Sequence, residues 1–393
     1  MENSSNAVVF YLNGLNDTRS HKYVFFFFTL LFYLLIILFN QTVIITILLE
    51  KSLHEPMYIF ICNLNFNTLY GTAGFYPKLL ADFLSDTHVI SYTGCLIQAF
   101  VIYSSLMCEF TSLTVMAYDR YVAICKPLDY HSIMSALTAG KIVLILWILM
   151  FFEAIIPILL TVRLPLCGSH IDKLYCDNWS IVKLSCIDTA LNNIYGYVLI
   201  IAHILQALFI LYSYFEIIRE CLKSSEGRIK FIQTCLPHLI ALMSFTITTI
   251  FDVMYSRYGS RNTPQTIRNI MAVVFLVIPP LLNPLVYGLN LTQIRIKILM
   301  MCNRKINSGK SSLEEKEHEA DCKINSTCPS GDTWRDRKKE EKENRNRNPF
   351  STVPSGRSSP CGGLLIPPGR SSVCLKGPHS CGSWFISRDS CGY

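Results

Sequence analysis

Long apolar stretches alternate with short polar segments over most of this chain of 393 residues. Seven of these stretches are each long enough to cross about 30 Å of hydrocarbon as a helix, which takes about 20 residues. None alternates polar and apolar residues over about ten positions, as the strands of a membrane β-barrel do. The pattern therefore predicts an all-α membrane protein with seven transmembrane helices, at residues 23–49, 57–84, 96–119, 141–162, 194–218, 233–255 and 270–289.

Both ends of the predicted membrane domain, residues 23–302, differ from this pattern. Residues 1–22 lack the apolar core of a cleavable signal peptide, so the first apolar stretch is expected to act as its own insertion signal. After the seventh stretch, isoleucines mix with Arg295 and Lys297, which predicts a short amphipathic helix along the membrane surface. Cys302 follows, and it is either a palmitoylation site or an unmodified cysteine.

Residues 303–393 form a tail of a different composition. Its first half is dense in Lys, Arg, Glu and Asn, and its second half is rich in Ser, Gly, Pro and Cys. No apolar periodicity survives, so we expect the tail to be disordered and cytoplasmic. It either carries regulatory phosphorylation sites or is non-coding sequence joined to the gene, and we favour the second interpretation.

The composition agrees with a membrane protein. Hydrophobic residues make up 51% of the chain and charged residues 16%, against about 25% charged residues in an average soluble protein. The net charge of +7 is spread over short loops and the tail, whereas nucleic-acid binding would need basic residues on one folded face. Nothing in the sequence points to a metal, a cofactor or an enzyme.

Glycosylation sequons and loop charges predict the orientation of the chain. Sequons at Asn3 and Asn16 place the N-terminus outside if they are used, and a third, at Asn178, falls in a loop expected on the same side. The opposite loops carry more Lys and Arg, as cytoplasmic loops do, with Arg257 among the exceptions. We therefore expect a plasma-membrane protein with an extracellular N-terminus.

Four of the 16 cysteines fall on the expected outer side: Cys95, Cys167, Cys176 and Cys186. An even number in an oxidising compartment permits two disulfides, and the sequence alone allows three pairings. The bridges would either simply staple a loop or hold it as a lid over the helices.

The sequence MAYDRYVAICKPLDY, Met116–Tyr130, ends the third apolar stretch with an adjacent acid and base, Asp119 and Arg120. A charge inside a bilayer is costly, so such a pair should lie at a helix end or face a partner. The pair is either an end-cap that fixes the depth of the helix or part of a conformational switch.

With this motif the chain resembles the rhodopsin-like G-protein-coupled receptors, and within them the odorant receptors, of the fish type. The resemblance covers roughly residues 20–302 and extends to the long loop with three cysteines. It is also carried by Asn40, Trp147, HEPMYIF at 54–60, GRIKFIQTCLPH at 227–238 and PPLLNPLVY at 279–287.

The resemblance implies a receptor with the disulfides Cys95–Cys176 and Cys167–Cys186. A small-molecule odorant would bind from the outside, and the receptor would activate a heterotrimeric G protein of the olfactory stimulatory type and raise cyclic AMP.

A switch at the inner end of the bundle is also implied. In the resting state Arg120 would be held by Asp119, and activation would turn its guanidinium towards Tyr214. Pro284 would let the seventh helix bend and bring Tyr287 into the same cluster. The expected switch residues are Asp119, Arg120, Tyr121, Tyr214, Lys230, His238, Asn283, Pro284 and Tyr287, although His238 is explained about as well as a buried packing residue.

Ligands of this fold bind between the outer halves of the helices, in a mainly apolar pocket. Ile102 stands where amine receptors carry an aspartate, so an amine ligand is not predicted. Arg257 would either anchor a carboxylate through paired N–H donors or be a solvated loop charge, and the second interpretation is favoured. The expected lining residues are Gln98, Ile102, Tyr103, Leu106, Val198, Leu199, Ala202, Thr249, Ile250, Val253 and Arg257, with His203 as a further candidate.

Two other classes of function fit the sequence less well. A transporter or channel should show internal repeats and charged or broken helices at the midplane, but no repeat is visible and Glu109 is the one strong acid there. A receptor-like chain that no longer signals stays open because of the unusual tail. Thr68 stands where many receptors carry a sodium-binding aspartate, so sodium binding is not predicted.

Overall fold

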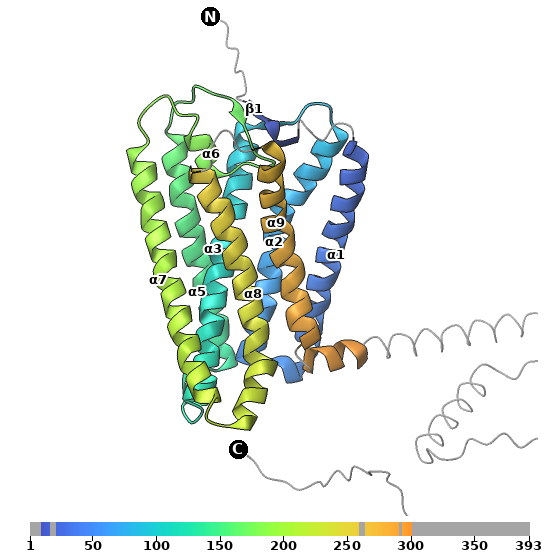
Figure 1. The fold of residues 1–393 in the computed structure, drawn as a ribbon, viewed down its shortest axis with the longest axis vertical. Helices are drawn as coiled ribbons and strands as arrows, with labels where there is room; N and C mark the ends of the chain where they lie inside the picture. Colours follow the sequence, from blue (N-terminus) through green and yellow to red (C-terminus); the bar gives the residue numbers. More distant parts are fainter. Residues whose placement is uncertain (1–8, 16–20, 259–263, 291–292, 301–393) are drawn as a thin grey trace, which may run out of the picture. The chain divides into compact units, whose positions relative to one another are not determined.

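The computed structural model describes residues 9–15, 21–258, 264–290 and 293–300. In this part of the chain seven long helices run side by side as a bundle (Figure 1). They are α1 (Lys22–Leu49), α2 (Pro56–Leu84), α3 (Tyr92–Cys125), α5 (Ala136–Val162), α7 (Ala190–Cys221), α8 (Ser225–Tyr258) and α9 (Gln265–Asn290). Each predicted span lies within one of these helices, so the seven-helix architecture is confirmed.

All seven helices begin before the apolar stretch that predicted them, and two of these starts are capped by a serine side chain. Ser91 precedes α3 and accepts a hydrogen bond from the backbone N–H of Gly94 at 3.1 Å. Ser135 precedes α5 and accepts one from Thr138 at 3.2 Å. Such caps satisfy an N–H group that the first turn leaves free. α2 begins with Pro56, where the missing N–H costs nothing.

α2 differs from the other helices in its polarity. Among the described residues, six helices are long and apolar enough to cross a membrane: α1, α3, α5, α7, Cys235–Met254 of α8 and Ile267–Gly288 of α9. The polar residues of α2 face inwards, since Asn63 donates to the Ser112 hydroxyl at 2.9 Å and Asn67 to the Ser105 carbonyl at 2.9 Å. Phe66, in contrast, is exposed on the outer face. α2 thus satisfies its polar groups inside the bundle.

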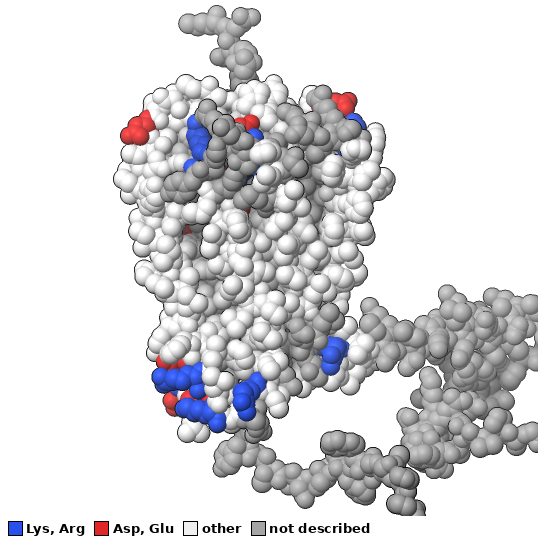
Figure 2. Space-filling view, in the orientation of Figure 1, with Lys and Arg blue, Asp and Glu red and all other residues white. Residues whose placement is uncertain are grey.

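Charged side chains gather at the two ends of the face in Figure 2, and the band between them is almost free of charge. A helix bundle satisfies its backbone hydrogen bonds within each helix, which is what a hydrocarbon environment requires. The charge distribution and the apolar helices together describe a multi-pass membrane protein.

One end of the bundle is covered by the loop 163–189, here called the lid. The lid contains β3 (His170–Ile171) and α6 (Asn178–Val182). β1 (Val9–Leu12) lies between β3 and β2 (Val89–Ser91), antiparallel to β2 and parallel to β3 (Figure 1). Its residues Phe10 and Leu12 are buried. The sequence predicted only a polar segment here, so this strand is a feature that sequence reasoning missed.

The opposite end carries the short elements η2 (Lys51–Leu53) and α4 (Tyr130–Ile133) and a helix over residues 293–300. The last helix turns sharply away from the axis of α9 (Figure 1). Ile294 is fully buried, and Lys297 binds Glu50 at 3.0 Å. A short helix was predicted at this place, and its position on a membrane surface stays a prediction. Cys302 and the tail 303–393 lie outside the described residues.

Candidate functional site

Two disulfides hold the lid in place. Cys95–Cys176 joins the first turn of α3 to the lid, and Cys167–Cys186 closes the lid on itself. These are the pairs that the resemblance implies. Gln98 adds a polar contact, because it accepts from the Cys176 backbone N–H at 2.8 Å and donates to a carbonyl of α2 at 3.0 Å. Gln98 therefore anchors the lid, and it is not among the residues that line the cavity beneath it.

A cavity of about 380 Å³ lies beneath the lid, between α3, α5, α7 and α8. Its size is within the range of small-molecule sites, about 300–1,000 Å³. The predicted residues that line it are Tyr103, Leu106, Leu199, Thr249, Ile250, Val253 and Arg257, together with the further candidate His203.

Three other predicted lining residues lie elsewhere. Val198 and Ala202 are exposed on the outer face of α7, because the inward face of this helix is formed one position further along, by Leu199 and His203. Ile102 lines a separate cavity of about 40 Å³ between α2, α3, α8 and α9. The error on α7 is one of helix phase, since an apolar helix that faces lipid on one side gives little signal of which side faces inwards.

The lining also contains acids that the sequence analysis did not select. Asp177 enters from the lid and Asp252 from α8. Asp252 is the one acid between residues 231 and 256, and an acid in so apolar a stretch was a signal that could have found it. No comparable signal marked Asp177, because the lid has no helical or strand periodicity.

Arg257 is the basic residue of the cavity lining. Its guanidinium lies over the Trp179 ring, 4.4 Å from the centroid, and beside the Tyr197 ring at 5.3 Å. Gly196 leaves room for it, since a Cβ at that position would overlap the guanidinium. Within the described ranges no carboxylate forms an ion pair with Arg257. Aromatic faces stabilise a cation without neutralising its charge, so the guanidinium can still pair with an anion.

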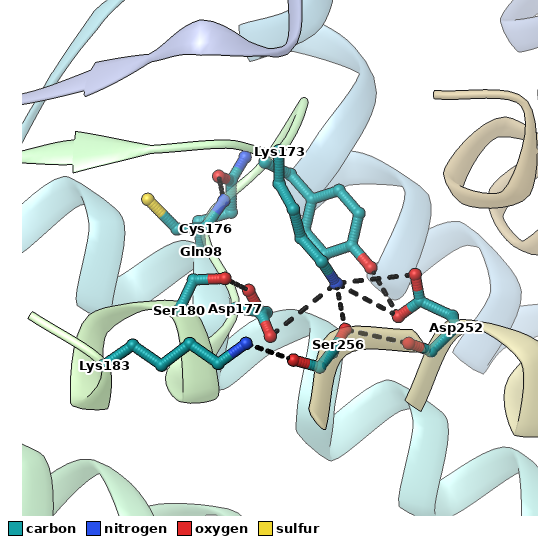
Figure 3. Close-up of polar contacts among 9 residues, drawn as sticks. Gln98, Lys173, Cys176, Asp177, Ser180, Lys183, Asp252 and Ser256 are labelled. Carbon is teal, nitrogen blue, oxygen red and sulfur yellow. Dashed lines mark hydrogen bonds and ion pairs between the residues drawn. The ribbon is translucent and has the colours of Figure 1, made fainter. Parts of the chain in front are cut away.

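Next to the cavity, the lid is bound to α8 by a group of polar side chains (Figure 3). Lys173 Nζ lies 3.4 Å from Asp252 and 3.7 Å from Asp177, and it donates to the Ser256 hydroxyl. The Tyr175 hydroxyl donates to Asp252 at 2.8 Å. We call these five residues the lid–α8 cluster. Burial alone would lower the pKa of Lys173, but the two carboxylates raise this pKa by more, so the amine stays charged.

At the other end of α3, Arg120 is held by its neighbour. Arg120 Nε donates to Asp119 Oδ2 at 3.0 Å, and the Tyr130 hydroxyl donates to Asp119 Oδ1 at 2.9 Å. Burial and the neighbouring carboxylate raise the pKa of Tyr130, so its hydroxyl stays a donor. Tyr121 packs half-buried against the hydrophobic core. This is the arrangement expected for the resting state, with Tyr130 as a partner that sequence reasoning missed.

Two further predicted switch residues contact each other. Tyr214 of α7 is hydrogen-bonded to His238 of α8, and both side chains are buried. This bond joins α7 to α8 near the level of Arg120. The side chain of Lys230, a further predicted switch residue, lies outside the described residues.

The predicted residues of α9 lie within the bundle. Asn283 donates to Glu109 Oε1 at 2.8 Å, and Pro284 is buried in the interior of the helix. The Tyr287 hydroxyl is buried without a hydrogen-bond partner among the described residues. Tyr287 therefore has a free hydroxyl near the core that contains Tyr214.

The third sequon is not available for a glycan. Asn178 is 8% exposed, and its side-chain oxygen accepts a hydrogen bond from Thr161 at 2.8 Å. A sugar on this side chain would displace the first turn of α6. Asn3 and Asn16 lie outside the described residues.

Comparison with known proteins agrees with this architecture. A family model described as "Olfactory receptor" matches residues 28–305. Olfactory receptor 1496 of Rattus norvegicus is 36% identical over 313 residues, which cover 78% of this chain and 99% of that protein. Olfactory receptor 51E1 of Homo sapiens is 35% identical over 304 residues, covering 76% of this chain and 95% of the human protein. The expected fish type stays a prediction. The chain belongs to the olfactory receptor family of G-protein-coupled receptors.

Proposed function

We propose that this protein is an odorant receptor of the plasma membrane, with the lid outside the cell and the Asp119–Arg120 pair facing the cytoplasm. A small molecule enters the cavity beneath the lid and shifts the bundle to a state that activates the stimulatory olfactory G protein. The observation that carries this proposal is the position of two sites on one helix. α3 contributes Tyr103 and Leu106 to the cavity and carries Asp119 and Arg120 in its last two turns.

The contacts at the inner end define what activation has to change. Arg120 leaves Asp119, and Tyr214 leaves His238 when α8 moves away from α7. The freed guanidinium, the Tyr214 hydroxyl and the Tyr287 hydroxyl then face the G protein together. A ligand produces this change only to the extent that it binds the active arrangement better than the resting one.

The lining residues support a ligand class. The lining is largely apolar, with hydrogen-bonding groups at Thr249 and His203 and a guanidinium at Arg257. The ligand we propose is therefore a small, partly hydrophobic molecule whose carboxylate pairs with Arg257. A second function is not proposed.

A cyclic-AMP reporter tests the proposal in cells that express the full chain and the stimulatory olfactory G protein. Mixtures of odorants that include short carboxylic acids are expected to raise cyclic AMP through the parent chain. Arg120→Glu should reach the cell surface and stay silent, because a carboxylate cannot replace the movable cation. Arg163→Glu, an exposed arginine at the lid end of α5, is the matched control and should respond like the parent. A normal response of Arg120→Glu contradicts the switch.

A further inference from the structure

The lid–α8 cluster consists of charges that are shielded from water. The side chains of Lys173, Asp252 and Asp177 are 12%, 13% and 5% exposed, and Tyr175 is 1% exposed. Lys173 also lies over the Tyr175 ring, 5.0 Å from the centroid. Removing one partner of a buried pair leaves an uncompensated charge, which costs more than the pair itself contributes. Lys173 is therefore one of the contacts that fix the position of the lid relative to α8.

The lid–α8 cluster joins the lid to α8, and the other attachments of these two elements differ. The lid is bonded covalently to α3 through Cys176, the residue that precedes Asp177. Asp252 and Ser256 lie four residues apart, hence on one face of α8, and both line the ligand cavity. Lys173 thus links a lid that is fixed to α3 with the cavity-facing side of α8 (Figure 3).

The same helix carries a contact of the switch at its other end. His238 lies 14 positions before Asp252 in α8, about 21 Å along a helix at 1.5 Å per residue. Its bond to Tyr214 ties α8 to α7 in the present arrangement. α8 is therefore held near its outer end by Lys173 and near its inner end by Tyr214.

We propose that Lys173 is a positioning residue of the receptor, which acts through Asp252 to keep α8 in the arrangement where Tyr214 binds His238. A ligand that contacts Asp252 or Ser256 from the cavity weakens this link and releases the helix. This inference rests on the proposed receptor function, because its readout is signalling. The contact between Lys173 and Asp252 should set the fraction of receptors that are active without ligand. Weakening a contact made only in the resting state shifts the population towards the active state.

The experiment measures basal cyclic AMP in the absence of ligand, divided by the amount of full-length receptor at the cell surface. Lys173→Met and Asp252→Asn are each expected to raise this ratio several-fold over the parent. Asp252→Asn keeps the shape of the side chain and its contact with Tyr175. It is therefore the variant to measure if Lys173→Met does not reach the cell surface. Lys183→Met is the matched control, because Lys183 also joins the lid to α8, through the Ser256 carbonyl at 2.6 Å, but from an exposed position.

Exchanging the charges of Lys173 and Asp252 distinguishes a positioning role of Lys173 from general damage to the lid. The double variant Lys173→Asp, Asp252→Lys restores one ammonium between two carboxylates, and its basal signal should fall back towards that of the parent. Unchanged basal signalling in both single variants overturns the inference, as does an equal rise in Lys183→Met. If the parent still responds to odorants in that case, the receptor function stands and only the role of Lys173 falls. A parent that never signals would overturn both.

Discussion

Asp252 and Arg257 lie little more than one turn apart on α8, and both line the cavity, yet their surroundings differ. The carboxylate of Asp252 is occupied by Lys173 and Tyr175. The guanidinium of Arg257 is packed between aromatic rings. An entering molecule therefore meets two carboxylates, Asp252 and Asp177, that are already paired with Lys173, and one cation whose donors are open, which favours an anionic group on the ligand.

Replacing Arg257 by Ala should weaken the response to carboxylic acids by about ten- to a hundredfold in half-maximal concentration. A hydrogen bond to a charged group contributes about 1.5–3 kcal/mol, and each 1.4 kcal/mol is about tenfold in affinity. Arg257→Lys should give a half-maximal concentration between those of the parent and of Arg257→Ala, since lysine keeps the charge but loses the paired donors. Dose–response curves in the cyclic-AMP reporter measure the effect.

Alcohols with the carbon skeleton of each acid provide the control ligands for Arg257→Ala. Their responses should change little, because a neutral hydroxyl forms no ion pair with the guanidinium. Acid responses that persist at parental potency would show that Arg257 is a surface charge, the interpretation that the sequence alone favoured.

At the residue scale, the sequence located residues that belong to a motif more accurately than residues whose position depends on helix phase. Asp119, Arg120 and Tyr214 could be located because they stand in recognisable local patterns. Val198 was placed one position off because α7 is apolar on nearly all sides. Lys173 could not be predicted at all, since its partner Asp252 is 79 residues away and only the folded lid brings the two together.

At the scale of elements, the lid depends on a close approach between the N-terminal segment and the loop 163–189. Gly14 follows β1 and lies against the backbone of the lid, where a Cβ would come within 2.6 Å of the Lys173 carbonyl carbon and 2.8 Å of the Leu174 nitrogen. Both are backbone atoms, so they cannot rotate away as a side chain can. Asn269 of α9 donates to the Gly14 carbonyl at 2.6 Å, and this bond also holds the Gly14 backbone in place.

Gly14→Ala is therefore expected to destabilise the lid by about 1–3 kcal/mol, the usual cost of an extra methyl in a packed site. The measurement is the thermal stability of the detergent-solubilised receptor, together with its amount at the cell surface. Gly140→Ala is the matched control, because Gly140 has no atom within 4 Å of an added Cβ. In a helix this change is expected to stabilise by about 0.5–1 kcal/mol. Equal stability of Gly14→Ala and the parent would contradict the close contact.

Six of the seven helices are long and apolar enough to be predicted from the sequence as membrane spans on that ground alone. α2 was included correctly although its asparagines make it more polar, since these side chains find partners inside the bundle. β1 could not be predicted, because it has four residues and pairs with segments near residues 90 and 170. A strand this short is specified by its distant partners and not by its own pattern.

At the scale of the whole molecule, the lid end and the Arg120 end are chemically different surfaces. The lid end has the disulfides, which persist in oxidising compartments. At the opposite end, Cys125 and Cys221 form no disulfide within the part of the chain that the structure describes. This asymmetry supports the proposed orientation, with the lid outside the cell.

Glycan mapping tests the orientation. Treatment with an enzyme that removes N-linked glycans should increase the gel mobility of the parent chain from cells. The double variant Asn3→Gln, Asn16→Gln should lose this shift, whereas Asn178→Gln should keep it because Asn178 is buried. A shift that disappears only with Asn178→Gln would contradict both the burial of that side chain and the use of the N-terminal sequons. If the gel mobility of the parent chain does not change, its sequons carry no glycan, and the proposed outside location of the N-terminus loses this support.

The position of β1 has a consequence for biosynthesis. Val9–Leu12 is translated before all seven long helices, but its parallel partner β3 is complete only after residue 171 has been made. Contacts between segments so distant in sequence form late, because the intervening chain must first be ordered. β1 is thus made before the helix bundle yet is among the last elements to reach its final place, and until then the lid lacks the strand that joins β3 to β2.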